Sequence, residues 1–389
     1  MKSKLIFMII LAAVLGGWLV FPAGAAEYTP QRFTICTGRR YTMRGWVCPD
    51  NPPESDMVSL QSEQREVSSP SPLQGGQIGR QPDPELSSLP YHYLQVLDAR
   101  VPLYTTLDDA VQGTNRNRSL IPGFDYVSFD YQVKVKGKWY YRTVSDFWMS
   151  GKEASYLGST PSFQGLEFDR TPETDFGWVL VETESVPHPG SQDPDPTGKR
   201  YQRFDVVRII DERDADSIAY VKIGDREWLP AHSVAVVEVR EAPPQGVDQQ
   251  RWIGVNLEQQ TLTVYEGGEL SFATVVSSGV EGNWTRPGTF EIKSKLETEL
   301  MRGSFAADRS DYYYLEHVPW TMYFDESRAL HGTYWHDDYG RPQSKGCVNL
   351  SPGDAHWIFK WAEEGDMVHV YDPSGKTPTD PDLFHSGGA

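Results

Sequence analysis

The sequence has few cysteines and little positive charge. Only three of its 389 residues are cysteine, and an odd number in an exported protein leaves one thiol without an intramolecular partner. Lys and Arg number 36 against 54 Asp and Glu, which gives a net charge of −18. Proteins that bind nucleic-acid backbones or anionic lipid surfaces need a basic face, so we expect no nucleic-acid partner.

Long hydrophobic runs are also scarce. The exception is the N-terminus, where two lysines precede an apolar run from Leu5 to Phe21 and an Ala-Gly-Ala-Ala ending at residues 23–26. This pattern predicts a signal peptide over residues 1–26 and an exported protein of the cell envelope, either in the wall or in the periplasm. An uncleaved anchor is the alternative, since residues 5–26 could span a bilayer. After cleavage we expect no stable membrane insertion.

Cys36 and Cys48 lie close together after the predicted signal peptide. In an oxidising compartment this spacing predicts a local disulfide that closes a hairpin within residues 27–48. A redox or metal pair is the alternative, but no histidine or Cys-x-x-Cys pattern lies nearby. Residues 49–90 are rich in Ser and Pro, which predicts a flexible linker.

Aromatic residues, Gly and Pro are plentiful, and we expect a mainly β fold. Short alternating segments predict two small β-barrels, one over residues 91–172 and one over residues 173–245. In strand order and length they resemble bacterial SH3-like wall-associated modules. They would either bind a wall ligand or serve as spacers that pack against their neighbours.

The alternation of apolar and polar residues is clearest over residues 251–372. Alternating segments predict strands at Trp252–Leu257, Thr261–Tyr265, Leu270–Ser277, Pro287–Ile292 and Val368–Tyr371. A Ser-Pro-Gly-Asp sequence from Ser351 predicts a helix start, and Gly365 predicts the helix end. We therefore expect a mainly β domain with one helix, followed by a disordered tail over residues 373–389.

The third cysteine, Cys347, lies in a short motif with catalytic features. His331 precedes it by sixteen residues, and a cysteine nucleophile needs such a base to form a thiolate at neutral pH. Gly346 allows a tight turn that can aim N–H groups at a developing oxyanion. A buried structural thiol is the alternative, although the residues around Cys347 are mostly polar or small rather than apolar.

These residues resemble the catalytic domain of the L,D-transpeptidases of the YkuD type. That family has His-Gly followed, after about sixteen residues, by Ser-His/Lys-Gly-Cys, a hydrophobic residue and Arg or Asn. Here the two parts are His331-Gly332 and Ser344-Lys345-Gly346-Cys347-Val348-Asn349. The resemblance covers about residues 251–372 and implies a β-sandwich or barrel with one helix.

The resemblance also implies a reaction. Cys347 would attack the carbonyl of the diamino acid in a peptidoglycan tetrapeptide stem, and the terminal D-Ala would leave to give a thioester. The amine of a second stem would then attack, forming a 3→3 cross-link. His331 would move the proton, oriented by a backbone carbonyl at or near Gly332, and N–H groups around Gly346 and Cys347 would hold the oxyanion. We expect no metal and no cofactor.

Other residues of the motif are assigned as substrate-binding candidates. Ser344 and Asn349 would brace the loop or contact the substrate. Lys345 would meet a substrate carboxylate or remain a solvated loop lysine. Tyr323 and Trp335 would line the cleft or pack in the core.

The loop between the two motifs contains His336, Asp337 and Asp338, which with His331 could indicate a metal site. Their spacing matches no recognised zinc pattern, so we expect no metal there.

Two further functions remain open from the sequence. One is an L,D-carboxypeptidase, in which water replaces the amine. The other is a non-catalytic wall-binding protein, against which the intact Cys–His pair argues. Because Asp and Glu outnumber Lys and Arg within residues 251–372 as well, wall binding would rest on local cleft contacts rather than on bulk charge.

Overall fold

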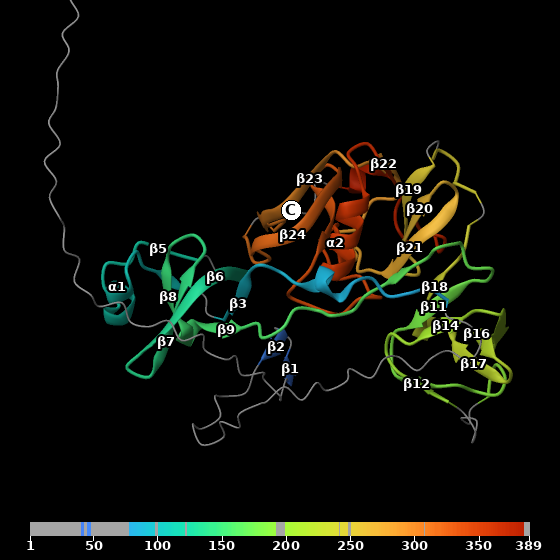
Figure 1. Ribbon diagram of the computed structural model, residues 1–389, viewed down its shortest axis with the longest axis horizontal. Helices are drawn as coiled ribbons and strands as arrows, with labels where there is room; N and C mark the ends of the chain where they lie inside the picture. The colour runs from blue at the N-terminus through green and yellow to red at the C-terminus, as the bar shows by residue number, and fades with distance from the viewer. Residues whose placement is uncertain are drawn as a thin grey trace, which may run out of the picture. The chain divides into compact units, whose positions relative to one another are not determined.

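The computed structural model describes residues 78–97, 100–120, 123–191, 199–240, 242–247, 250–306 and 308–384 (Figure 1). It also describes the backbone of an antiparallel hairpin of β1 (Arg40–Thr42) and β2 (Gly45–Val47). The predicted signal peptide, Cys36 and Cys48, and residues 49–77 of the predicted linker lie outside the described residues. The prediction of a mainly β fold is confirmed.

One layer around the catalytic motif is a six-stranded sheet with the order β10-β21-β20-β19-β27-β22. Its strands are β10 (Leu166–Glu167), β19 (Arg251–Asn256), β20 (Thr261–Glu266), β21 (Glu269–Val275), β22 (Gly288–Glu291) and β27 (Met367–Tyr371). β19 and β27 run parallel, whereas the other neighbours are antiparallel. The strands predicted within residues 251–372 all belong to this sheet.

The second layer is part of a nine-stranded sheet in which β26-β25-β24-β6-β3-β9 lie side by side, with β23 on β24 and β7 between β6 and β8. The strands that follow residue 290 are β23 (Ser294–Gly303), β24 (Tyr313–Asp325), β25 (Arg328–Gly332) and β26 (Val348–Leu350). None of these was predicted. β24 contains positive φ angles at His317 and Trp320, and such irregularities interrupt the alternation by which a strand is recognised.

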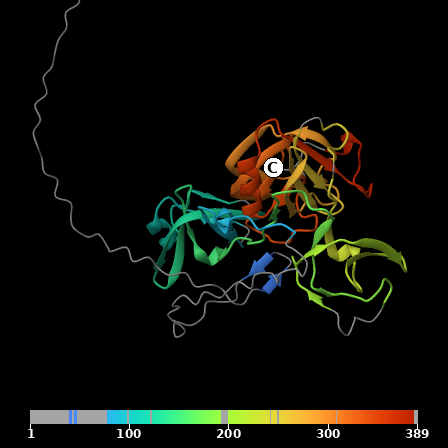
Figure 2. The same cartoon turned by 45° about the vertical axis from the view of Figure 1, so that its right-hand side comes forward.

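The two layers enclose a hydrophobic core together with helix α2 (Pro352–Trp361). Fully buried apolar side chains come from both sheets and from the helix, including Ile253, Val264, Met322, Leu330, Val348 and Ile358. In Figures 1 and 2 the yellow-to-red strands and α2 stay grouped in both views.

Helix α2 begins where the sequence predicts. The Ser351 hydroxyl accepts a hydrogen bond from the N–H of Asp354 at 3.2 Å, so Ser351 is the N-cap. The helix ends at Trp361, before the predicted end, because the backbone at Ala362 is already extended. Gly365, with a φ of +97°, forms the turn that leads into β27.

The region predicted as the first module, residues 91–172, contributes to both sheets. Its strands and helix are β3 (His92–Val96), β4 (Pro102–Leu103), α1 (Leu107–Gln112), β5 (Arg118–Ser119), β6 (Phe124–Val135), β7 (Lys138–Thr143), β8 (Trp148–Ser150) and β9 (Ala154–Tyr156). β6 pairs in parallel with β24, and β10 pairs with β21. Helix α1 was not predicted.

The region predicted as the second module, residues 173–245, forms three small sheets. Their strands are β11 (Phe176–Val179), β12 (Thr183–Glu184), β13 (Arg200–Tyr201), β14 (Val206–Arg208), β15 (Asp211–Ala215), β16 (Ile218–Gly224), β17 (Glu227–Pro230) and β18 (Val234–Val237). The SH3-like character of both modules and their boundaries stay predictions.

Two segments are more ordered than the sequence predicts. The end of the predicted linker forms a 3-10 helix, Pro84–Ser87, and the carbonyl of Leu86 lies 3.2 Å from Nδ1 of His356 in α2. In the tail predicted to be disordered, residues 381–383 form another 3-10 helix, and the ring of Phe384 packs against the guanidinium of Arg328 at 5.6 Å. Packing on the folded domain orders both segments.

We predict that Asp354 makes stability depend on pH. Its buried carboxyl accepts the N–H of Gly165 at 2.9 Å and bonds the hydroxyl of Thr274 at 2.5 Å, and burial raises its pKa to about 7. An ordinary Asp titrates near pH 4 when unfolded, so the stability that the protonated carboxyl contributes is complete below about pH 4 and is lost as the pH rises to about 7.

The substitution Asp354→Asn removes this titration. We expect the free energy of unfolding of the variant, relative to the unmodified protein, to rise between about pH 4 and pH 7 in urea titrations. Asp382→Asn, at an exposed position, is the control. A difference between Asp354→Asn and the unmodified protein that stays constant over this range would contradict the prediction.

Candidate active site

The two residues predicted to carry the chemistry are brought together by two neighbouring parallel strands: His331 lies on β25, and Cys347 is the loop residue immediately before β26. In the register of β25 and β26, Leu330 is opposite Val348 and His331 is opposite Asn349. Leu330 and Val348 point into the core, and side chains alternate along a strand, so His331, Cys347 and Asn349 face the other side. These three residues line one cleft of about 980 Å³.

His331 is held in a defined orientation. Its Nδ1 lies 3.1 Å from the carbonyl oxygen of Gly332, and its side chain is almost completely buried. Burial lowers the pKa of His331 to about 4, although the carbonyl acts in the opposite direction. The imidazole is therefore neutral at pH 7, with the Nδ1 hydrogen donated to Gly332 and the lone pair of Nε2 left to accept a proton.

Gly332 also allows close packing beneath the site. A Cβ at this position would lie 3.0 Å from Pro319 and 3.3 Å from the side chain of Ala355 in α2. The absence of a side chain therefore lets β25 approach the helix.

The thiol of Cys347 is buried and protonated in the resting protein. Burial raises its pKa to about 11, against the lowering effects of a backbone hydrogen bond from Ala329 and of the charge on Arg328. Its Sγ lies 3.8 Å from the carbonyl oxygen of Ser327. The resting pair is thus a neutral thiol and a neutral imidazole, and a base must remove the thiol proton during any reaction.

Hydrogen bonds fix the loop that carries the cysteine. The Ser344 hydroxyl accepts the N–H of Gly346 at 3.1 Å and donates to the carbonyl of Cys347 at 2.5 Å. The hydroxyl of Thr285 donates to the carbonyl of Gly346 at 2.9 Å. Gly346 itself has a φ of +120°, where a side chain would be strained. Ser344 therefore braces the loop, and the Gly346 N–H that the sequence assigns to an oxyanion is already bonded.

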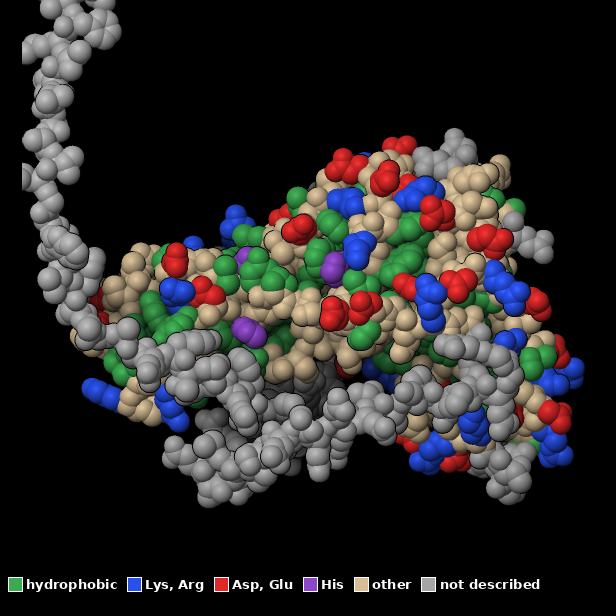
Figure 3. Space-filling model, in the orientation of Figure 1, with side chains coloured by type: hydrophobic (Ala, Val, Ile, Leu, Met, Phe, Trp, Pro, Cys, Tyr) green, Lys and Arg blue, Asp and Glu red, His purple; other side chains and the backbone are tan. Residues whose placement is uncertain are grey.

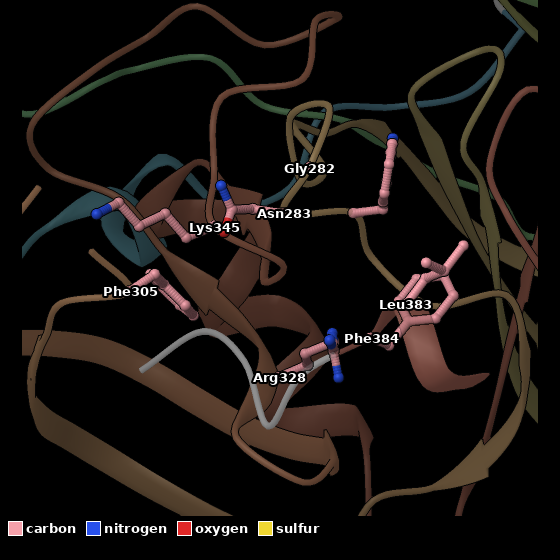
Figure 4. A pocket seen from close by; sticks show the side chains of 8 residues that line it. Gly282, Asn283, Phe305, Arg328, Lys345, Leu383 and Phe384 are labelled. Atoms are coloured by element: carbon pink, nitrogen blue, oxygen red, sulfur yellow. The ribbon is translucent and has the colours of Figure 1, made fainter. Parts of the chain in front are cut away.

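Lys345 lines the cleft, is partly exposed and already has an ion-pair partner. Its ammonium pairs with the carboxylate of Asp311 at 3.0 Å and also bonds the Asp311 carbonyl. Its Nζ lies 5.0 Å from the ring centre of Tyr313 and 5.3 Å from that of Phe305. Figure 4 shows Lys345 and Phe305 at one side of a small pocket of about 20 Å³, opposite Arg328, Leu383 and Phe384.

Of the remaining substrate-binding candidates, two line the cleft and one does not. Asn349 lines the cleft, and so does Trp335, whose ring centre lies 5.9 Å from that of His331. Tyr323 is partly buried on β24 and is not among the described residues that line the cleft.

Several residues of the cleft were missed by the sequence analysis. Tyr126 comes from the predicted first module, and Leu180, Glu182 and Arg203 come from the predicted second module. Arg203 donates to the carbonyl of Asp337 at 2.6 Å. No local sequence signal identifies such residues, because more than a hundred positions separate them from the motif.

The possible metal ligands in the loop have other partners. His336 Nε2 lies 2.9 Å from the side-chain amide of Asn349, and its Nδ1 accepts the N–H of Asp338 at 3.3 Å. Within the described part of the chain, no three His, Cys, Asp or Glu side chains form a cluster that could hold a metal ion.

Comparison with known proteins identifies the region around this cleft. Residues 250–370 match the family model described as the L,D-transpeptidase catalytic domain, YkuD. L,D-transpeptidase 1 of Mycobacterium tuberculosis is 27% identical over an alignment of 187 residues that covers 42% of this chain and 72% of that protein.

Solved structures give the same name. A mutant L,D-transpeptidase of Enterococcus faecium is 26% identical, covers 32% of this chain and has a TM-score of 0.29; the match spans half of that chain. An L,D-transpeptidase of Stackebrandtia nassauensis is 30% identical, with 35% of this chain and 60% of that chain covered and a TM-score of 0.27.

The raised pKa of Cys347 predicts how the thiol reacts. Iodoacetamide alkylates the thiolate, so in the folded protein we expect the alkylation rate at Cys347 to rise about tenfold per pH unit with no plateau below about pH 10. Mass spectrometry of the peptide that contains Cys347 separates this site from Cys36 and Cys48. In denaturant the same thiol should level off near its ordinary pKa of about 8.5. A plateau near neutral pH in the folded protein would show that the resting thiol is already ionised.

Proposed function

Because residues 250–370 are an L,D-transpeptidase catalytic domain of the YkuD family, we propose that the protein is an acyltransferase with Cys347 as its nucleophile. The observation that carries the proposal is the placement of His331 on β25 and of Cys347 immediately before the adjacent parallel strand β26. Both face one cleft, and the imidazole is oriented by the Gly332 carbonyl. A nucleophile, a base and a group that orients the base are what covalent acyl transfer requires.

The first half of the reaction forms a thioester. Nε2 of His331 takes the thiol proton as Sγ of Cys347 attacks the carbonyl carbon of the diamino acid in a tetrapeptide stem. The C–S bond forms, the C–N bond to the terminal D-Ala breaks, and the imidazolium protonates the departing amine. The neutral resting pair supports this order, since the proton moves only as the bond forms.

The second half transfers the acyl group to the side-chain amine of another stem, which gives a 3→3 cross-link. The cleft of about 980 Å³ lies at the upper end of the range for ligand sites, which supports a peptide-sized substrate. Water as the acceptor would instead make the protein an L,D-carboxypeptidase.

Export follows from this substrate, since peptidoglycan lies outside the cytoplasmic membrane, and the N-terminal pattern of residues 1–26 supports it. In the described residues no helix has the length and apolar character needed to cross a membrane.

On the face drawn in Figure 3, Lys and Arg side chains are interspersed with Asp and Glu. Attraction to an anionic polymer by bulk charge is therefore not the basis of wall binding.

Arg341 is the side chain that would recognise a carboxylate of the stem peptide. It is exposed at the cleft, and it has no ion-pair partner within the described residues, whereas Lys345 is paired with Asp311 and Arg203 bonds the carbonyl of Asp337. A guanidinium matches a carboxylate with two parallel hydrogen bonds. Lys345, which the sequence also suggests for a substrate carboxylate, lines the same cleft and remains a second candidate.

We expect Cys347→Ala to abolish the reaction. Incubation with a disaccharide tetrapeptide should give a cross-linked dimer that has lost one D-Ala, and the variant should lose about a thousandfold or more of this activity. Mass spectrometry distinguishes the dimer from the tripeptide that a carboxypeptidase would release. Unchanged thermal unfolding shows that the variant is folded, and cross-linking by the folded variant would refute the proposal.

Labelling of Cys347 with a carbapenem distinguishes the proposed enzyme from a non-catalytic wall-binding protein. A carbapenem should add its mass to Cys347 in the folded protein. Folded protein without this adduct would favour the wall-binding function.

We expect Arg341→Gln to raise KM about tenfold for a stem with free carboxylates and to leave kcat within about twofold, because the charge contributes to binding alone. With a stem whose carboxylates are amidated, the unmodified protein and the variant should have similar KM values. Arg302→Gln, an exposed arginine outside the cleft lining, is the matched control. Equal increases in KM for both stems would exclude carboxylate recognition.

A further inference from the structure

A second imidazole adjoins the proposed catalytic pair. His336 lies in the loop that follows β25 and lines the same cleft as His331 and Cys347. Its Nε2 is 2.9 Å from the side-chain amide of Asn349, and its Nδ1 accepts the backbone N–H of Asp338 at 3.3 Å. Asn349 is in turn directly opposite His331 in the ladder of β25 and β26. The reaction proposed above gives His336 no role.

The hydrogen bonds determine which ring nitrogen carries the hydrogen. Burial, with further contributions from His331 and Arg203, lowers the pKa of His336 to about 3, so the ring is neutral at pH 7. A neutral imidazole has one N–H and one acceptor nitrogen. Because Nδ1 accepts from Asp338, the hydrogen must be on Nε2, and Nε2 donates to Asn349.

This donor fixes the orientation of the Asn349 carboxamide. The oxygen and nitrogen ends of a carboxamide have nearly the same shape, so the hydrogen-bond network decides which end faces a neighbour. Only the oxygen end can accept from Nε2 of His336. The oxygen therefore faces His336, and the NH2 group is at the other end of the amide.

That other end of the amide is buried and has no hydrogen-bond partner among the described residues. The residue is 3% exposed and lines the cleft beside His331 and Cys347. A buried N–H group without an acceptor is costly, and an oxygen atom of a bound ligand would satisfy it. The N–H of Gly346 is already bonded to Ser344, so the amide would supply a donor that Gly346 does not.

We propose that His336 is a positioning residue that holds the Asn349 carboxamide with its N–H group toward the carbonyl oxygen of the acyl group attacked by Cys347. The inference rests on the proposed acyl transfer. As negative charge develops on that oxygen, the oriented amide stabilises it. His336 acts only through Asn349 and does not touch the reacting atoms.

The tautomer is the direct test and needs no activity. In the full-length protein labelled with ¹⁵N-histidine, long-range ¹H–¹⁵N spectra should show the ring of His336 with its hydrogen on Nε2, assigned by the signals that His336→Phe removes. A ring with its hydrogen on Nδ1 would overturn the proposal, because the amide would then present its N–H group to His336.

Kinetics test the consequence. We expect His336→Phe, which keeps a ring of similar size, to slow acylation of Cys347 by a carbapenem about 10- to 100-fold, since a carbonyl is attacked. Alkylation by iodoacetamide forms no oxyanion and should stay within about twofold of the unmodified rate. His369→Phe is the matched control, because His369 is a partly buried histidine of the same domain outside the cleft lining. Equal losses in acylation and alkylation would mean that His336 merely supports the fold.

A double-mutant cycle tests whether His336 acts through Asn349. Asn349→Asp keeps an acceptor for Nε2 but removes the N–H donor, so it should slow acylation at least as much as His336→Phe does. In the Asn349→Asp background, His336→Phe should have no further effect. Additive losses would overturn the proposal. If the unmodified protein is not acylated at all, the proposed function fails, and the tautomer measurement still decides the orientation of the amide.

Discussion

The parallel pairing of β25 with β26 is the constraint on which the cleft depends. It brings together two motifs that are separated by a loop of irregular structure, and it sets which side chains face the cleft. Leu330, Val348 and Leu350 fix the register because they fill the core on the opposite face. A shift by one residue in either strand would turn the cleft-facing side chains into the core and expose apolar ones, so the packing of the core also specifies the geometry of the site.

The same burial that fixes the site determines its resting chemistry. Away from bulk water, neither the thiol of Cys347 nor the imidazole of His331 is charged, which protects the thiol until a substrate arrives. The buried backbone N–H and C=O groups around the cysteine also need hydrogen-bond partners from the protein, because water does not reach them. The hydroxyl of Ser344 accepts the N–H of Gly346, and the hydroxyl of Thr285 donates to the Gly346 carbonyl. These hydrogen bonds hold the loop that carries the nucleophile in place.

The features that could be predicted from the sequence are local ones. The N-cap at Ser351 and the carbonyl of Gly332 beside His331 both depend on neighbours in the chain, and both are present. The features that were missed depend on contacts between distant residues. The partner of Lys345 is Asp311, on a segment with no recognised strand pattern, and the face of Tyr323 could not be assigned while β24 itself was not predicted. Glu182 and Arg203 reach the cleft only through the tertiary fold.

Charge shows why such distant contacts matter for function. An acidic protein would be expected to repel a substrate that carries carboxylates, and the sequence alone does not show which of its basic residues could offset this repulsion. In the folded protein these basic residues differ, because some already have hydrogen-bond or ion-pair partners. Lys345 is neutralised by Asp311, and Arg203 bonds the carbonyl of Asp337, so each holds a wall of the cleft in place. Arg341, without such a partner in the described residues, keeps its full charge for a ligand. Substrate recognition thus depends less on how many cations the domain contains than on which of them the fold leaves unsatisfied.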